Sequence, residues 1–246
     1  MCSSVEPFPV QVANDYDDLS RRATRLLIDE LAAKPDLLLC AAAGASPLGT
    51  YRYLAQERRN NPALFARLRV LKLDEWGGLE MNHPASCEQS LREHLLEPLG
   101  ISNERYVGFA SQPDDPEVEC HRMSAWLGRN GPIDICLLGL GVNGHIGFNE
   151  PGDALRPSAH VATLANESLR HPMLSAANAQ PKFGLTLGMA EILDARKIVL
   201  LVSGAHKRPS LERLCRDEIS TAFPASFLRL HRALICLCDR AAVGSP

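Results

Sequence analysis

Short apolar runs of strand length recur along the chain. Most of them are nearly continuous rather than alternating with polar residues, which is typical of strands covered on both faces of a sheet. We therefore expect a buried central sheet. The runs predict strands at Leu37–Ala43, Arg69–Leu73, Ile133–Leu140, Lys197–Val202 and Leu234–Cys238.

Segments with helical spacing of apolar residues lie between these runs. They predict helices at Leu19–Leu31, Leu48–Leu54, Cys87–Leu96, Val118–Leu127 and Leu211–Leu214. Because strand and helix take turns, the pattern predicts a three-layer, doubly wound α/β fold with a mostly parallel sheet. We expect residues 1–246 to form a single domain, with surface loops at Ser111–Pro116 and Arg170–Pro181.

The composition is that of an ordinary globular protein. Hydrophobic residues make up 46% of the 246 residues and charged residues 22%, close to the average for soluble domains. The net charge is -3 and no stretch gathers Lys and Arg with aromatics, so we expect no nucleic-acid partner. No signal peptide is recognisable and no apolar stretch has the length of a membrane span, so we expect a cytoplasmic protein without membrane contact.

The cysteines are scattered, and several lie in apolar runs where a reduced thiol acts as a small hydrophobe. We interpret them as free thiols. Cys236 and Cys238 would share one face of a strand and have no partner pair at a zinc spacing, so core packing is the favoured role and no metal is expected. The eight positions are Cys2, Cys40, Cys87, Cys120, Cys136, Cys215, Cys236 and Cys238.

The turn after the first predicted strand has the features of an anion site. Gly44 and Ala45 lead into Ser46 and Pro47, residue types favoured at the N-cap and the first position of a helix. Backbone N–H groups and the helix dipole would cradle a phosphate there, although capping alone explains many such turns. Lys207 follows another strand and a glycine, and it would either meet the same phosphate or remain a solvated surface lysine.

Candidate proton-transfer groups also follow strands, where ligands bind in doubly wound sheets. Asp74 directly follows an apolar run, so its carboxylate would serve as a general base or brace the turn. We interpret its neighbour Glu75 as structural. In the glycine-rich segment 139–152, His145 would move protons between oxygen atoms while Glu150 holds its tautomer. The structural alternative is a histidine bonded to a backbone carbonyl and a solvated loop acid.

Several common chemistries lack sequence support. The spacing Gly139-x-Gly141-x-x-Gly144 lies in mid-chain and would put His145 at the start of a helix, which disfavours dinucleotide binding. The motifs of P-loop nucleotide hydrolysis, of zinc proteases and of α/β-hydrolases do not occur. We therefore expect neither a cofactor nor a metal.

Taken together and in this order, these loops resemble the glucosamine-6-phosphate deaminase/isomerase family, part of a larger group that includes 6-phosphogluconolactonases. The most specific segment is Asn143–Gly152 (NGHIGFNEPG), supported by Leu73–Glu75, Leu185–Gly188 and Val202–Lys207. The resemblance covers nearly the whole chain. It implies a modified Rossmann fold and a cofactor-free isomerisation and deamination of an amino-sugar 6-phosphate, the small molecule that the protein would bind.

The resemblance also implies roles for individual residues. Asp74 would be the enolisation base that carries a proton between C2 and C1 of the open-chain sugar. His145 would open the sugar ring with help from Glu150. Asn143 stands where some members have an acidic residue, so it could orient its neighbours but not ionise.

The implied phosphate site combines the Ala43–Ser46 turn with Lys207. Ala43 and Ala45 stand where other members often have Thr and Gly, so one side-chain hydrogen bond would be missing. A further phosphate ligand of the family falls near Arg170 and His171, and the register points to His171.

Several details resemble the galactosamine-6-phosphate branch of the family. Conversion of galactosamine-6-phosphate to tagatose-6-phosphate and ammonia is therefore favoured, with glucosamine-6-phosphate to fructose-6-phosphate and ammonia as the close second. The segment 153–161 lacks the basic cluster of allosteric members, so we expect no such regulation. The details are Lys72–Trp76 (KLDEW), Cys87–Glu88, His171–Leu174 (HPML) and Pro224–Leu228 (PASFL).

Three questions stay open at this point. A 6-phosphogluconolactonase would use a similar phosphate loop, although Asn149–Gly152 speaks against it. A non-catalytic sugar-phosphate sensor is disfavoured because roughly 35 residues before the first predicted strand are too few for a DNA-binding domain. The chain could act as a monomer or as a homo-oligomer.

Overall fold

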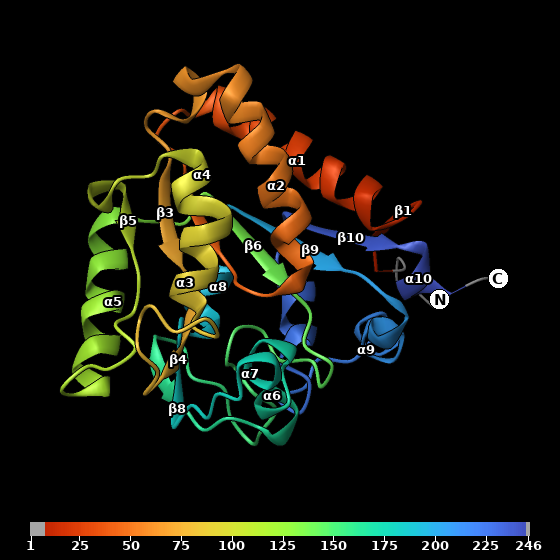
Figure 1. Cartoon of the computed structure of the whole chain (residues 1–246). Coiled ribbons are helices and arrows are strands. Elements are labelled where there is room, and N and C mark those ends of the chain that lie inside the picture. The colour runs from red at the N-terminus through yellow and green to blue at the C-terminus, as the bar shows by residue number, and fades with distance from the viewer. Residues whose placement is uncertain (1–7, 245–246) are drawn as a thin grey trace.

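A sheet of seven parallel strands forms the centre of the computed structural model, which describes residues 8–244 (Figure 1). The strand order is β1-β10-β9-β6-β2-β3-β5, and every neighbouring pair is parallel. The strands are β1 (Val10–Ala13), β2 (Leu38–Ala41), β3 (Arg69–Lys72), β5 (Tyr106–Val107), β6 (Ile135–Gly139), β9 (Lys197–Val202) and β10 (Leu234–Asp239).

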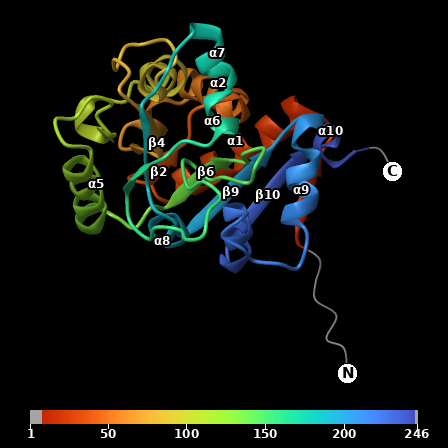
Figure 2. The same cartoon turned by 90° about the horizontal axis from the view of Figure 1, so that it is seen from below.

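Helices cover both faces of this sheet, so its strands are apolar on both sides. Leu38 and Cys40 of β2 belong to the core on one face, and Leu39 and Ala41 belong to the core on the other. Figure 2 shows α1 and α2 on the side of the sheet opposite α8. One face carries α1 (Tyr16–Ala33), α2 (Ala45–Asn60), α3 (Cys87–Leu91), η2 (Arg92–Leu96) and α4 (Glu97–Leu99), and the other carries α5 (Pro116–Asn130), α8 (Met189–Leu193), α9 (Arg208–Leu214) and α10 (Arg240–Val243).

The predicted three-layer, doubly wound fold is therefore confirmed, but the large sheet has two strands beyond the five expected, β1 and the two-residue β5. β1 at Val10–Ala13 is a short edge strand whose two central residues are exposed, so it leaves no continuous apolar run. The first strand consequently begins at Val10 rather than near residue 37.

A second, antiparallel sheet lies beyond the ends of β3 and β6, and the sequence patterns did not predict it (Figure 1). Its order is β4-β8-β7. Leu73 alone separates β3 from β4, so the chain passes directly from the large sheet into the small one. The strands are β4 (Asp74–Gly77), β7 (His160–Ala162) and β8 (Phe183–Thr186).

The two predicted surface loops are only partly correct. The segment 170–181 contains the helix α7, and Ser111 is buried while Pro116 begins α5. The helix α7 buries Leu174 alone, so its sequence has no helical spacing of apolar residues that would have predicted it. The remaining short elements are η1 (Pro62–Phe65), η3 (Asn103–Arg105), α6 (Asn166–Leu169), α7 (Pro172–Ala177), η4 (Ala205–Lys207) and η5 (Pro224–Leu230).

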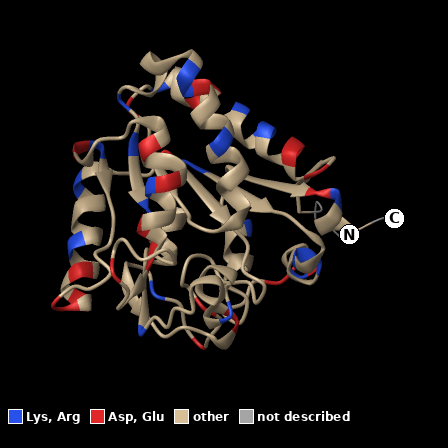
Figure 3. Cartoon of the chain, in the orientation of Figure 1, with Lys and Arg blue, Asp and Glu red and all other residues tan. Residues whose placement is uncertain are grey.

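The cysteines of the described chain are free thiols, as predicted, and all but Cys215 are buried. Cys2 lies outside the described residues. The sulfur atoms of Cys236 and Cys238 are 3.9 Å apart on one face of β10, and both residues belong to the core. Within residues 8–244, no helix is both long and apolar enough to cross a membrane. Both acidic and basic residues lie on the outer helices (Figure 3).

Candidate active site

The site lies where the order of the large sheet reverses. From β2 the chain builds outward through β3 and β5, and from β6 it builds the opposite way through β9 and β10. Loops that follow the two central strands diverge at such a point and leave room for a ligand. Here these loops also approach each other: Ser46 Oγ after β2 is 3.5 Å from the position that a Cβ atom of Gly139, at the end of β6, would occupy.

The turn after β2 exposes the start of a long helix. Gly44 is the N-cap of α2, with a φ of 99° that favours glycine, and no side chain caps the helix. The helix therefore begins at Ala45, and the prediction that Ser46 is the N-cap was wrong. Because no side chain satisfies the N–H groups of the first turn, they remain available to an anion.

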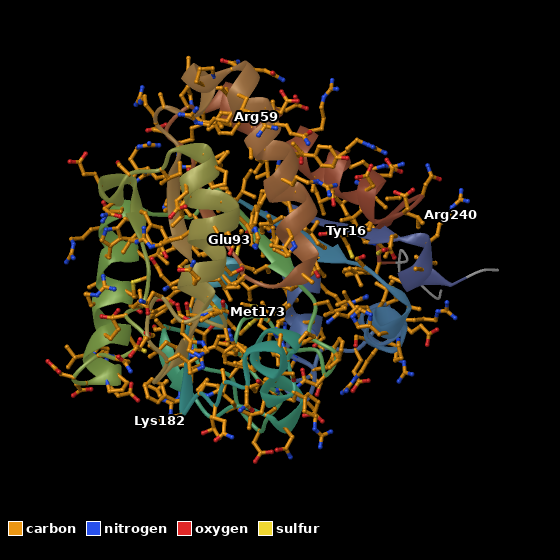
Figure 4. The ribbon with its side chains drawn as sticks, viewed as in Figure 1. Tyr16, Arg59, Glu93, Met173, Lys182 and Arg240 are labelled. Carbon is orange, nitrogen blue, oxygen red and sulfur yellow. The ribbon has the colours of Figure 1, made fainter. Side chains whose placement is uncertain are left out.

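Tyr16, labelled in Figure 4, braces this turn from the start of α1. Its hydroxyl donates to the backbone oxygen of Ala45 at 2.8 Å and accepts from the backbone N–H of Gly49, also at 2.8 Å. Tyr16 thus fixes the first turn of α2 from the side of α1. Sequence reasoning missed Tyr16 because the contact joins two helices that are far apart in the chain.

His171 lies against the same turn, whereas Arg170 is exposed. The His171 Nε2 atom is 3.7 Å from the position of a Cβ atom on Gly44. His171 is the N-cap of α7, and its Nδ1 accepts from the backbone N–H of Met173 at 3.3 Å. In the neutral ring the proton consequently sits on Nε2, which is the nitrogen that faces the turn.

The pKa values of two basic groups, His171 and Lys207, are lowered. Burial, assisted by the positive charges of His145 and Lys207, lowers the pKa of His171 to about 4. Burial also lowers the pKa of Lys207, which stands half-buried at the start of α9. The start of α9 also contacts the loop that carries His145, because the Ser210 hydroxyl donates to the backbone oxygen of Val142 at 2.6 Å.

Asp74 stands at the junction of the two sheets, half-buried, at the first position of β4. Burial raises the pKa of its carboxyl to about 7, helped by the negative charge of Glu75 and opposed by Lys72 and a hydrogen bond from Cys87. Its Oδ2 atom is 3.5 Å from the position of a Cβ atom on Gly147. Asp74 thus reaches the loop that carries His145, although the two residues are far apart in the sequence.

Glu75, the next residue along β4, has the structural role that we predicted. Its carboxylate is fully buried and accepts hydrogen bonds from the Lys72 ammonium at 2.7 Å and from the backbone N–H groups of Trp76, Cys87 and Glu88, each at 2.8 Å. The last two N–H groups belong to the first turn of α3, so Glu75 ties β4 to the start of that helix.

His145 and Glu150 form a close pair within the loop after β6. The distance from His145 Nδ1 to Glu150 Oε2 is 3.4 Å, and both side chains are mostly buried. The imidazole packs on Gly141: a Cβ atom there would lie 2.5 Å from two ring carbons of His145. The loop forms turns rather than the helix that a dinucleotide-binding motif would open.

Asn143 and Ser168 complete the surroundings of this pair. The Asn143 amide donates to Glu150 Oε2 at 3.0 Å, and its oxygen accepts from the His145 backbone N–H at 3.1 Å. Ser168 donates to Glu150 Oε1 and lies 3.2 Å from His145 Nδ1. Burial alone would raise the pKa of Glu150, but the hydrogen bond and positive charge of His145 and the bonds from Ser168 and Asn143 together lower it.

The loop is also fixed to the second sheet. The Phe148 backbone N–H donates to Thr186 Oγ1 at 3.2 Å, and the Asn149 amide donates to the backbone oxygen of Leu187 at 2.9 Å. Thr186 pairs with Asp74 across β4 and β8. Neither Thr186 nor Ser168 was a candidate from sequence reasoning, because neither stands at a recognisable spacing from the loop. The motif Leu185–Gly188 was the nearest signal.

Among residues 8–244, no group of three or more His, Cys, Asp or Glu side chains could hold a metal ion. The candidate site is instead a set of titratable side chains near the turn at Gly44, where the uncapped start of α2 could bind an anion.

The sequence of residues 14–236 matches the family described as glucosamine-6-phosphate isomerases/6-phosphogluconolactonase. The chain belongs to this family. One relative from Escherichia coli (strain K12), named "Putative deaminase AgaI", is 40% identical over 230 residues, which cover 94% of this chain and 91% of the relative.

Solved structures agree with this membership in the glucosamine-6-phosphate isomerase/6-phosphogluconolactonase family. A monomeric glucosamine-6-phosphate deaminase superposes with a TM-score of 0.89 at 34% identity, covering 96% of this chain and 98% of its own. A 6-phosphogluconolactonase from Leishmania guyanensis reaches a TM-score of 0.77 at 18% identity, with 97% and 98% of the two chains covered, and so shares the fold.

Proposed function

We propose that this chain is an amino-sugar-6-phosphate deaminase and isomerase that needs no cofactor and acts in the cytoplasm. One observation carries the proposal. A carboxyl with a raised pKa, at Asp74, and a histidine–carboxylate pair, at His145 and Glu150, meet beside an uncapped helix start at the reversal point of the sheet. General acid–base groups around an anion site suit the rearrangement of a phosphorylated sugar.

The phosphate binds at the turn after β2. Backbone N–H groups of Gly44, Ala45 and Ser46 point to it from the helix start, and the Lys207 ammonium supplies a positive charge. His171 donates from Nε2, the nitrogen that faces Gly44. Because the phosphate lies remote from the reacting carbons, its binding energy holds the sugar in place for the chemistry.

Ring opening is the first chemical step. His145 takes the proton of the anomeric hydroxyl and returns a proton to the ring oxygen as the C1–O5 bond breaks. Glu150 stabilises the imidazolium that exists between these transfers, and its own pKa, lowered as described, keeps it ionised. Asn143 orients both groups through its two hydrogen bonds.

Isomerisation and deamination follow on the open-chain sugar. Asp74 removes the proton at C2 while the C2 ammonium gives a proton to O1, which yields an enolamine. Asp74 then returns its proton to C1, which leaves an iminium carbon at C2. Water adds to this carbon and ammonia departs, so that the product is a ketose 6-phosphate. A carboxyl with a pKa of about 7 is a stronger base than an ordinary aspartate and is still half ionised near neutral pH.

We favour galactosamine-6-phosphate as the substrate, with tagatose-6-phosphate as the product, over glucosamine-6-phosphate and fructose-6-phosphate. Two of the segments that resemble the galactosamine branch, Lys72–Trp76 and Cys87–Glu88, lie at or next to Asp74. Lys72 bonds both Glu75 and Glu88, and the Trp76 ring lies 6.0 Å from the His171 ring. Trp76 therefore lies beside His171, whereas Lys72 and Glu88 are buried next to β4.

Ammonia release tests the proposal directly. The protein is incubated separately with galactosamine-6-phosphate, glucosamine-6-phosphate and 6-phosphogluconolactone, and ammonia and lactone hydrolysis are measured in one preparation. We expect ammonia from both amino sugars and faster release from the galactosamine compound. Lactone hydrolysis without ammonia would contradict the proposal in favour of a lactonase, and binding without turnover would favour a sensor.

A further inference from the structure

Ser168 occupies a position that the mechanism above does not explain. Ser168 lies on α6 and is 2% exposed to solvent. Its Oγ atom stands between the two members of the catalytic pair, bonded to Glu150 Oε1 and 3.2 Å from His145 Nδ1. One buried hydroxyl from another element thus touches both groups that are meant to open the sugar ring.

The proton count of these groups fixes the direction of each bond. A serine hydroxyl has one proton and two lone pairs. The lowered pKa of Glu150 makes it a carboxylate, which only accepts hydrogen bonds, so the Ser168 proton points to Glu150. Since its one proton is used toward Glu150, the Ser168 oxygen can only accept a hydrogen bond from His145. His145 Nδ1 must therefore carry the proton that it donates to Ser168.

The carboxylate itself is a weaker partner for Nδ1. Glu150 Oε2 is 3.4 Å from Nδ1, longer than the usual 2.7–3.2 Å of such hydrogen bonds, and it already accepts from Asn143 at 3.0 Å. The Ser168 oxygen is nearer, at 3.2 Å. The chain of donors therefore runs from His145 Nδ1 to Ser168 and from Ser168 to Glu150.

We propose that Ser168 is a positioning residue that holds the neutral His145 ring in the Nδ1–H form and links its charge to Glu150. Nε2 is then left unprotonated, which is the form that takes a proton from the anomeric hydroxyl. A ring in the other form would present an N–H group to the substrate and could not act as a base. The catalytic consequence rests on the proposed function, whereas the proton position is a property of the free protein.

The first test therefore needs no substrate. Nitrogen-15 NMR of the full chain distinguishes protonated from unprotonated ring nitrogens, and His145→Gln identifies the His145 signals. We expect Nδ1–H in the unmodified protein and in Ser168→Thr, which keeps the hydroxyl. In Ser168→Ala the proportion of Nε2–H should rise. A wild-type ring that is mainly Nε2–H, or equal proportions in Ser168→Ala and wild type, would overturn the proposal.

The second test follows the kinetic effect. Ser168→Ala should lower kcat for the cyclic amino-sugar phosphate by about tenfold, as a fraction of molecules loses acid–base catalysis worth roughly 10²–10⁴-fold. KM and the binding of an open-chain amino-alditol 6-phosphate should stay within about twofold of wild type, because the phosphate and C2 contacts are untouched. Ser168→Thr should recover most of the activity.

Ser175→Ala is the matched control, because Ser175 is an exposed serine on the neighbouring helix α7. It should leave both measurements unchanged. Equal loss in the alanine and threonine variants, or loss of open-chain ligand binding in Ser168→Ala, would indicate a structural role and contradict the proposal. If no amino sugar is turned over at all, the proposed function fails, and the NMR result still decides where the His145 proton lies.

Discussion

Two clusters of charged side chains lie on and beside β4. In one the buried charges are paired, and in the other a carboxylate lacks a cationic partner. In the first, Lys72 lies 2.7 Å from carboxylate oxygens of both Glu75 and Glu88, and all three side chains are almost completely buried. In the second, which comprises Asp74 and the His145–Glu150 pair, Asp74 is the immediate neighbour of Glu75, but no cation within residues 8–244 forms an ion pair with it, and its pKa is raised to about 7. Adjacent residues on one strand thus have contrasting environments.

The difference separates stability from chemistry. A buried ion is tolerated when partners satisfy it, as the backbone N–H groups and Lys72 satisfy Glu75. Asp74 lacks such partners, so its ionised form is destabilised and becomes a better base. We infer that the first cluster is the rigid support and that the second keeps the strain which catalysis needs. The following predictions test that division.

Asp74→Asn should have the largest effect on activity. The amide keeps the shape of the side chain but cannot take a proton, so kcat should fall by roughly 10²–10⁴-fold while substrate binding is largely kept. Steady-state kinetics and a binding measurement with the same substrate check this, with the exposed Asp153→Asn as control. Near-normal turnover would remove Asp74 from the mechanism.

The same variant should be more stable than wild type at alkaline pH. The pKa of Asp74 is raised in the folded protein from 3.8 to about 7, so folding favours the protonated form, and this stabilisation is lost as the pH rises through 7. At pH 8.5 the ionised carboxyl costs at most about 4 kcal/mol, from about 1.4 kcal/mol per pKa unit. Urea unfolding at pH 5 and 8.5 should show a gain for Asp74→Asn that is larger at the higher pH.

Lys72→Met should have the largest effect on stability. It leaves two buried carboxylates without their shared cation, which destabilises the fold by about 3–5 kcal/mol. Lys182→Met, at an exposed lysine beside the other end of β4, should cost much less (Figure 4). Adding Glu88→Gln to Lys72→Met should recover part of the lost stability. If the double variant were as unstable as Lys72→Met alone, lost packing rather than unpaired charge would be responsible.

The pH dependence of activity connects the two clusters. Asp74 must be ionised to act as a base, so kcat/KM should fall by about tenfold per pH unit below pH 7. Lys72 lowers the pKa of Asp74, and in Lys72→Met the fall should therefore begin at a higher pH. A pH–rate profile for each protein, measured where both remain folded, gives the comparison; an unchanged profile would show that the first cluster does not act on Asp74.

The sequence predicts the second cluster better than the first. Asp74, His145 and the Gly44 turn follow strong apolar strands, and the topology rule then brings such loops to one edge of the sheet. Lys72 instead interrupts an apolar run, and its burial depends on Glu88, sixteen positions further along the chain. No local pattern records such a contact.

The same reason explains the other elements that were missed. The second sheet consists of strands of three and four residues, which depend on their partners rather than on their own apolar pattern. In the sequence, Ser168 is one serine in a polar stretch. Only the folded chain brings α6 next to the loop that carries His145. The large sheet and its loops follow from local apolar runs, whereas these contacts require the three-dimensional arrangement.

A pair of glycine substitutions gives the finest test of the division between support and site. A Cβ atom on Gly141 would lie 2.5 Å from the His145 ring, so Gly141→Ala must displace the imidazole. A misplacement of this kind costs roughly 10²-fold in kcat/KM, with little change in stability if the loop yields. Gly128→Ala is the matched control, because no atom lies within 4 Å of the added methyl group on α5, and it should raise stability by up to about 1 kcal/mol without affecting activity. If Gly141→Ala kept full activity, the position of the ring against Gly141 would be irrelevant to catalysis, and the second cluster would lose its central member.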